Sequence, residues 1–147
     1  MPTCSDVMTR EPVCCEPGDD IRKAAELMKR EDVGSIPVVE SEESKRVVGI
    51  VTDRDLVVKV LADRRSIDGA TVRDAMTTNP ATCREDEDIR QAVSLMEEKQ
   101  VRRLPVVSRD GRLSGIIAQA DIATRLQEDR TTGELVEAIS EGGTARR

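Results

Sequence analysis

The stretch Gly49-Ile50-Val51-Thr52-Asp53-Arg54-Asp55 ends a strand and starts a helix, and the rest of the chain can be interpreted from it. Its apolar residues close a buried strand, and the Thr-x-x-Asp pattern then opens an apolar-patterned segment. The same design recurs at Gly115–Asp121, which reads GIIAQAD. Both copies place a carboxylate, Asp55 or Asp121, in the first turn of a helix. In a two-layer α/β unit, the place where a strand gives way to a helix is the usual mouth of a ligand cleft.

The composition argues against several classes of function. The 147 residues include no Phe, Tyr, Trp or His, so the core must be built from aliphatic side chains and Met. Without His, the commonest general base and the commonest metal ligand are missing. The net charge of −6, with no basic aromatic stripe, makes nucleic acid a poor partner. Since no P-loop and no nucleophile–base pair is present, we do not expect an enzyme.

Targeting signals are also missing from the sequence. No apolar run is long enough to cross a membrane, and the N-terminus lacks the hydrophobic region of a signal peptide. We therefore expect a cytoplasmic protein that has no membrane partner.

The cysteines Cys4, Cys14, Cys15 and Cys83 form no C-x-x-C pair. With no His to complete a ligand set, we expect no zinc site and no other bound metal. The simplest expectation is reduced thiols packed as small hydrophobic side chains. A redox role for the neighbouring Cys14 and Cys15 stays open, and Cys4, which we expect on a flexible terminus, could reach a partner.

The chain contains an internal repeat. Val7–Val39 aligns without gaps on Ala75–Val107, with 14 identities in 33 positions, and a two-residue deletion then brings Gly49 onto Gly115. A unit of about sixty residues therefore occurs twice. The boundaries that follow are a first repeat at 1–62, a linker at 63–70, a second repeat at 71–127 and a C-terminal tail at 128–147.

Hydrophobic periodicity gives each repeat the order β-α-β-β-α, which is an α/β (α+β) fold. The first repeat is expected to contain a strand at 12–15, a helix at Ile21–Arg30, strands at Ser35–Val39 and Val47–Thr52, and a helix at Asp53–Ala62. The second repeat follows the same order, with Thr71 capping its first helical turn. In the tail we expect a polar bend after Leu126, a short helix at Glu134–Ile139 and disorder at 141–147.

These repeated motifs resemble a tandem pair of CBS domains, or Bateman module. The matching pieces are VMT at Val7–Thr9, VGSIPVV at Val33–Val39 and GIVTDRD at Gly49–Asp55, each with a counterpart in the second repeat. The stretch Met96–Arg103 is also similar to small stand-alone CBS proteins of the hypoxic-response type. The resemblance implies two repeats packed with pseudo-twofold symmetry, two clefts between them, a homodimer and no catalysis. It also implies binding of adenine nucleotides or adenosyl compounds.

The resemblance also implies that each cleft mixes residues of both repeats. The first cleft would form around Asp55, whose carboxylate would accept hydrogen bonds from the ribose hydroxyls. Its other residues would be Thr52, Thr77, Pro80, Ala81, Arg103 and Leu104. The second would gather around Asp121, with Thr9, Pro12, Val13, Gly34, Ser35 and Ile36. Beside Asp121, Arg102 and Arg103 could face a phosphate, because a guanidinium fork suits that geometry. Ala118 stands where the family has Ser or Thr, so the Asp55 cleft is favoured.

Simpler explanations exist for the same residues. Thr52 and Asp55 also form a capping box, in which each side chain satisfies a free N–H group at a helix start. Asp121 persists although Ala118 cannot cap, so capping does not explain both copies. The two arginines before the second-repeat strand could equally be solvated surface charges.

We therefore expect a stand-alone regulatory module that binds AMP, ADP or ATP, needs no cofactor, and changes conformation in a way that a partner protein could read. The alternative is a structural or protein-interaction module with empty clefts. Such a module could respond to redox state through Cys14, Cys15 or Cys4.

Overall fold

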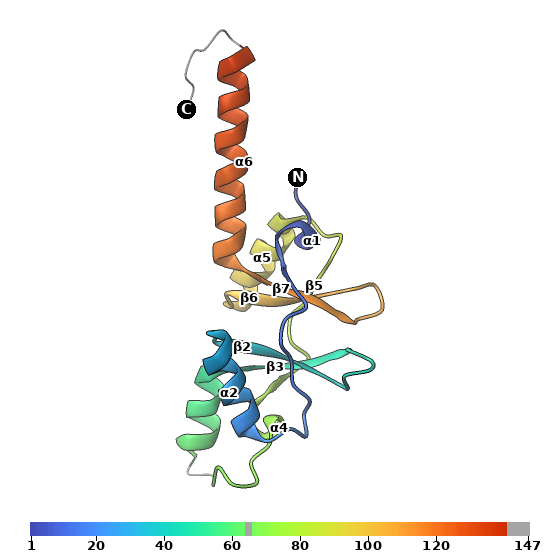
Figure 1. The fold of residues 1–147 in the computed structure, drawn as a ribbon, viewed down its shortest axis with the longest axis vertical. Coiled ribbons are helices and arrows are strands. Elements are labelled where there is room, and N and C mark those ends of the chain that lie inside the picture. The colour runs from blue at the N-terminus through green and yellow to red at the C-terminus, as the bar shows by residue number, and fades with distance from the viewer. Residues whose placement is uncertain (64–65, 141–147) are drawn as a thin grey trace.

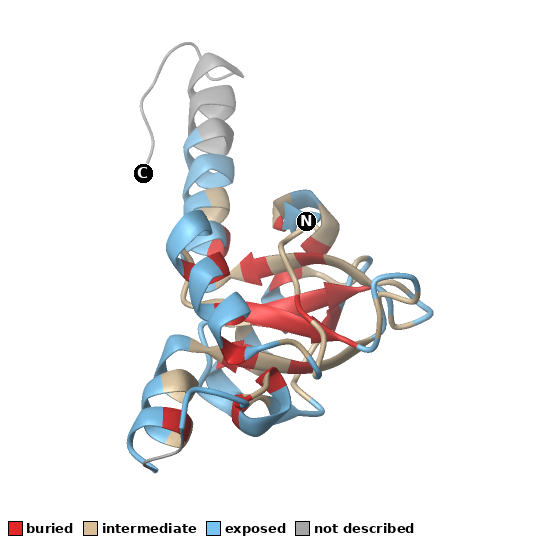
Figure 2. Ribbon diagram, turned by 60° about the horizontal axis from the view of Figure 1, so that its bottom comes forward, coloured by how far each residue is buried: buried red, intermediate tan, exposed pale blue. Residues whose placement is uncertain are grey.

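The computed structural model describes residues 1–63 and 66–140, which form two stacked halves of the same architecture. Figure 1 shows two small sheets lying next to each other, with helices on the outer side of each. Buried residues line the strands of both sheets and the inner faces of the outer helices, whose other faces are exposed (Figure 2). The α/β fold that the sequence predicts is confirmed.

The first half is built on helix α2 (Ile21–Glu31) and the hairpin of strands β2 (Ser35–Val39) and β3 (Val47–Thr52). Strand β2 pairs antiparallel with β3, with Ile36 opposite Val51. The hairpin leads into α3 (Asp53–Asp55), which continues as the π-helical segment η1 (Leu56–Leu61). The predicted helix before this hairpin, the two strands of the hairpin and the helix after it are confirmed, although most of the second helix is π-helical.

The second half repeats this arrangement with helix α5 (Ile89–Lys99) and strands β6 (Arg103–Val107) and β7 (Leu113–Ala118). A short strand, β5 (Cys83–Arg84), runs parallel to β6 on its other side. Both halves place a β-bulge at the same point of the hairpin, between the last two residues of β2 and of β6.

Each half borrows the first helix and strand of the other repeat. Helix α1 (Cys4–Val7) and strand β1 (Thr9–Arg10) join the second half, where β1 pairs with β7. Helix α4 (Val72–Ala75) and strand β4 (Thr77–Thr78) join the first half, where β4 pairs with β3. The repeats seen in the sequence and the halves that pack in space are therefore offset by one helix and one strand.

The repeated glycine of the GIVTDRD stretch makes this exchange possible. A Cβ on Gly115 would lie 2.6 Å from the Thr9 carbonyl oxygen and 2.6 Å from the Met8 sulfur. A Cβ on Gly49 would lie 2.9 Å from the Thr77 carbonyl oxygen. Only a residue without a side chain lets the exchanged strand approach so closely, which explains why both copies of the motif begin with Gly.

Helices α2 and α5 begin in the same way. Asp20 precedes α2 and accepts a hydrogen bond from the Arg22 N–H at 2.8 Å, and Asp88 does the same for Arg90 before α5 at 2.9 Å. Such caps satisfy N–H groups that the helix cannot pair internally. Capping therefore explains the acidic residues at both helix starts.

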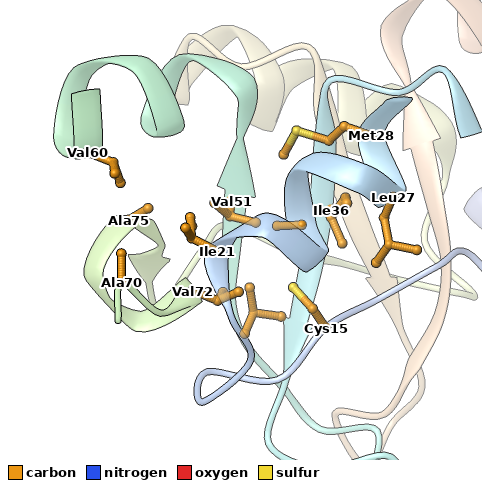
Figure 3. Packing of buried hydrophobic residues seen from close by; sticks show 12 residues of the cluster. Cys15, Ile21, Leu27, Met28, Ile36, Val51, Val60, Ala70, Val72 and Ala75 are labelled. Atoms are coloured by element: carbon orange, nitrogen blue, oxygen red, sulfur yellow. The ribbon is translucent and has the colours of Figure 1, made fainter. Parts of the chain in front are cut away.

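Each half has its own core of aliphatic side chains, as a chain without aromatic residues requires. The first core, shown in Figure 3, consists of Cys15, Ile21, Ala24, Leu27, Met28, Ile36, Val38, Val51, Val60, Ala70, Val72 and Ala75. The second consists of Cys4, Met8, Cys83, Ile89, Ala92, Met96, Leu104, Val106, Ile117 and Ile122. Each core includes residues of the exchanged helix, so neither can form from one repeat alone.

Three expectations from the sequence are wrong. Residues 12–15 do not form a strand: the strand lies earlier, at Thr9–Arg10, because pairing with β7 decides its position, and Cys15 makes only an isolated bridge to Val38. The tail does not bend after Leu126, because α6 (Gln119–Ser140) runs on as one 22-residue helix that extends away from the body (Figure 1). Cys4 is not on a free terminus but fully buried in the second core. The predicted disorder at 141–147 lies outside the described residues.

We expect Gly115→Ala to destabilise the protein by about 1–3 kcal/mol, because the new methyl group collides with the backbone of the exchanged strand. Gly18→Ala is the matched control, since a Cβ there has no neighbour within 4 Å. Urea unfolding of the two variants measures the difference. Equal midpoints would show that the close approach at Gly115 does not limit stability.

Candidate functional site

A cavity of about 480 Å³ lies next to Asp121 and takes residues from both halves. This volume lies within the range of small-molecule sites. Its lining consists of Thr9, Glu11, Pro12, Val13, Glu31, Val33, Ser35, Pro37, Arg103, Ile116, Ala118, Ala120 and Asp121.

The exchange of segments brings these residues together. Thr9 belongs to β1 on the second half, and Ser35 begins β2 on the first half. The connection from β1 back to the first half runs over residues 11–13, so it lines the cavity between them. Arg103 begins β6, and Asp121 lies in the first turn of α6. The first turn of a helix favours negative charge, because the helix dipole is positive at this end.

Asp121 presents an exposed carboxylate beside this cavity. Among the described residues, no hydrogen bond or ion pair engages it. A second hollow of about 260 Å³, lined in part by Thr124 and Arg125, shares Asp121 and Thr9 with the first. The carboxylate therefore lies where the two hollows meet, with its hydrogen-bonding capacity unused.

The Ser35 hydroxyl is a second unused group. Its Oγ is buried and has no hydrogen-bond partner among the residues that the structure describes. A buried hydroxyl without a partner costs about 1–3 kcal/mol relative to a paired one. Since Ser35 lines the cavity, a polar group of a molecule bound there would be placed to satisfy it.

The charges around the cavity are mixed. Arg103 is the cation that lines it, and Glu11, Glu31 and Asp121 are acidic. Arg102 does not line the cavity: its carbonyl oxygen accepts a 2.8 Å hydrogen bond from the Gln119 N–H and so ties the start of α6 to β6.

The equivalent carboxylate of the first half is already engaged. Asp55 accepts a hydrogen bond from the Thr52 N–H at 2.9 Å, and its own N–H donates to Thr52 Oγ1 at 3.1 Å. Lys59 Nζ lies 3.3 Å from Asp55 Oδ1, and the Asp55 side chain is only 16% exposed. The capping box suggested by the sequence is therefore formed, and a cation covers the same carboxylate.

The repeat symmetry shows how the two halves diverged. Arg125 occupies the place of Lys59, and each cation donates to a carbonyl of the exchanged helix, Ala75 at 3.1 Å for Lys59 and Asp6 at 3.3 Å for Arg125. Arg125 turns its second contact to Asp129, with Nε and Oδ1 3.3 Å apart. As a result Asp121, unlike Asp55, is left without a cation.

The remaining predicted site residues either line the cavity or lie elsewhere in the fold. Six residues assigned to the Asp121 cleft line the cavity, namely Thr9, Pro12, Val13, Ser35, Arg103 and Asp121. Five others are occupied elsewhere: Ile36 and Leu104 are buried in the two cores, Thr77 pairs with β3, Ala81 packs against the second core, and Gly34 leaves room for the Asp53 carboxylate. Pro80 is half-buried in the segment between β4 and β5.

Several lining residues escaped the sequence reasoning. Ile116 alternates along β7 with the buried Ile117, so the period-two pattern of a strand was an available signal for it. Glu31 ends α2, and nothing in its local sequence marks it as part of a cavity.

Two features are absent from the part of the chain that the structure describes. There, no three side chains of His, Cys, Asp or Glu gather as a metal site needs. Nor is any described helix long and apolar enough to span a bilayer.

A protein family and several known proteins are similar to this chain. The family model for the CBS domain matches residues 4–62 and 72–128. The uncharacterized protein YlbB of Bacillus subtilis is 37% identical over 142 residues, which cover 97% of this chain and 94% of that protein. Hypoxic response protein 1 of Mycobacterium tuberculosis is 34% identical over 128 residues, covering 87% of each.

Solved structures show the same fold with different bound groups. The structure of Hypoxic Response Protein I, which holds two coordinated zinc ions, has a TM-score of 0.75 at 34% identity and covers 83% of this chain and 97% of its own. CBSX2 in complex with AMP has a TM-score of 0.76 at 28% identity, covering 88% and 99%. The CBS domain pair of MJ0100, bound to 5'-methylthioadenosine and S-adenosyl-L-methionine, has a TM-score of 0.76 at 26% identity, covering 88% and 98%. With two matched repeats spanning most of its length, this chain belongs to the CBS-domain family as a tandem CBS pair.

Proposed function

We propose that this CBS pair is a cytoplasmic regulatory module, not an enzyme, that binds an adenine nucleotide (AMP, ADP or ATP) in the cavity beside Asp121. The main support is that one cavity joins a carboxylate without a partner, a buried hydroxyl without a partner and an arginine. The related CBSX2 structure holds AMP, and the MJ0100 pair holds adenosyl compounds, which supports the class of ligand.

Each group has a role suited to a nucleotide. The Asp121 carboxylate can accept hydrogen bonds from both hydroxyls of a ribose, and Arg103 can pair with a phosphate through its guanidinium fork. Ser35 supplies a polar contact deeper in the cavity. Because the chain has no aromatic residues, the base would pack against aliphatic side chains such as Val13 and Val33.

The geometry favours the Asp121 cleft over the Asp55 cleft, which is the reverse of the order that the sequence suggested. At Asp55, a ligand would have to compete with the Thr52 N–H and the Lys59 ammonium group for the carboxylate. At Asp121 both competitors are missing among the described residues: no N–H group donates to this carboxylate, and Arg125 pairs with Asp129 instead. The Asp121 carboxylate is therefore the one that a ligand could engage without displacing a protein partner.

Binding would be transmitted through the segment 4–13, which comprises the exchanged helix α1, the exchanged strand β1 and the connection that follows them. Thr9 and Pro12 lie on that segment, while Ser35 and Arg103 come from the two separate sheets. A nucleotide in contact with all of them would bias how the two halves sit against each other, which a partner protein could sense. The size of that bias is limited by the difference in affinity for the two arrangements.

The first half also carries an apolar face that suits a homodimer. Val57, Val58 and Leu61 of η1 are 54%, 44% and 56% exposed. Neighbouring apolar side chains on one short helix favour contact with another surface. We propose that this face associates with a second copy of the chain.

A second candidate is an interaction module whose clefts stay empty. The charges favour it, because Glu11, Glu31 and Asp121 outnumber Arg103 around the cavity and would repel a polyphosphate. Thermal unfolding with a panel of nucleotides separates the two candidates, since a ligand that binds only the folded state raises the midpoint.

We expect Asp121→Asn to weaken AMP binding about 10- to 100-fold, because the amide removes charge-assisted hydrogen bonds to the ribose. Asp55→Asn is the matched variant and should leave this affinity unchanged. Isothermal titration calorimetry measures both. The assignment to Asp121 fails if Asp55→Asn causes the larger loss, and nucleotide binding itself fails if wild-type protein takes up no nucleotide.

For Ser35→Ala we expect opposite effects on stability and on binding. The free energy of unfolding without ligand should stay the same or rise by about 1 kcal/mol, because the variant removes a buried hydroxyl that has no partner. AMP affinity should fall about fivefold, because the ligand loses one hydrogen bond. Urea unfolding and calorimetry give the two readouts, with Ser94→Ala on the outer face of α5 as control. A clear loss of stability without ligand would mean that the hydroxyl has a protein partner.

Leu61→Glu should convert a dimer into a monomer, because it places a charge in the centre of the apolar face. Val101→Glu is the control, since Val101 is also exposed, at 39%, but follows α5 in the second half. Sedimentation equilibrium gives the mass of each variant. Dimers that persist in Leu61→Glu would show that another surface mediates association.

A further inference from the structure

Two buried cysteines meet where the exchanged N-terminal segment packs on the second half. Cys4 of α1 and Cys83 of β5 are both fully buried and belong to the same core. The main chain holds them in place: the Cys4 N–H donates to the Glu87 carbonyl at 2.8 Å, and the Ser5 N–H donates to the Glu85 carbonyl at 3.0 Å. Helix α1 packs against β5, which brings the two thiols into the same core.

We propose that Cys4 and Cys83 form a disulfide under oxidising conditions and so fasten the exchanged N-terminal segment to the second half. These two positions are 79 residues apart in sequence but belong to one layer of side chains. A link between them would close a loop that contains the whole first half. The proposal does not depend on nucleotide binding.

The repeat symmetry provides an internal comparison. Cys15 is the counterpart of Cys83, and Val72 is the counterpart of Cys4. Both residues lie in the first core, where Figure 3 labels them. A cysteine at this position is thus common to both halves and fills a core site as a small apolar residue. The second thiol, on the exchanged helix, is present in one half only.

The two thiols also differ in reactivity. Interaction with the neighbouring Cys83 thiol lowers the pKa of the Cys4 thiol, and the same interaction, together with burial, raises the pKa of Cys83. By contrast, burial raises the pKa of Cys15 to about 12. The thiolate is the nucleophile in disulfide exchange, so Cys4 is the thiol of the pair suited to attack first.

With glutathione disulfide as the oxidant, the reaction balances in two steps. The Cys4 thiolate attacks one sulfur of the oxidant, which releases one glutathione thiolate and forms a mixed disulfide. Cys83 then loses its proton and attacks the Cys4 sulfur, which releases the second glutathione. Two protein thiols are oxidised while one glutathione disulfide is reduced to two thiols. Since α1 is a single helical turn near the terminus, its local opening exposes Cys4 to the oxidant.

Peptide mapping tests the link directly. The full chain is incubated with glutathione disulfide under native conditions, its free thiols are blocked, and it is digested with trypsin without reduction. Cleavage after Lys and Arg places Cys4 in peptide 1–10, Cys83 in peptide 74–84, and Cys14 with Cys15 in peptide 11–22. We expect 1–10 joined to 74–84, and a midpoint of thermal unfolding about 10 °C higher than in the reduced chain.

Two variants sharpen the test. Cys4→Val, which copies the other half, should abolish both the link and the rise in midpoint. Val72→Cys should create a second link, from residue 72 to Cys15, because it reproduces the pair on the symmetric side. The proposal is overturned if the oxidised wild-type chain contains only glutathione adducts, a Cys14–Cys15 bond or free Cys4 and Cys83.

Discussion

The close approach of the exchanged strands to the central hairpins is the constraint on which the rest of the structure depends. Strand β1 lies against β7, with Thr9 opposite Ile116, and this contact is possible only because Gly115 has no side chain. Once β1 is held on the second half, the chain has to return to the first half along the interface. Residues 11–13 therefore line the cavity. The same packing encloses Cys4 in a core built mainly by the other repeat.

Two copies of one motif serve different purposes because of a few local substitutions. In the first half, the carboxylate of Asp55 completes a capping box and holds Lys59, so it contributes to the stability of the helix start. In the second half, Arg125 pairs with Asp129 instead, and no described residue engages the Asp121 carboxylate. Duplication thus preserved the position of the acid while its partners changed.

Both proposed devices act on the same segment. The nucleotide would contact Thr9 at its strand, and the disulfide would fix Cys4 one helical turn earlier. A molecule bound at one end and a covalent bond at the other would each restrict the movement of this segment against the second half. Because interactions formed only in the folded state raise its stability, either event would make the exchange harder to undo.

The sequence by itself determined the repeat, the aliphatic cores and the central hairpin, because these depend on local periodicity and on the spacing of identical residues. Helix α2 and strands β2 and β3 lie where their patterns predict. Tertiary structure alone decided which half each first helix and strand joins, since pairing of β1 with β7 joins residues more than a hundred positions apart. It also decided that Asp55 is engaged while no described residue engages Asp121. The partners of a carboxylate depend on packing in space: Lys59 pairs with Asp55, whereas Arg125 pairs with Asp129.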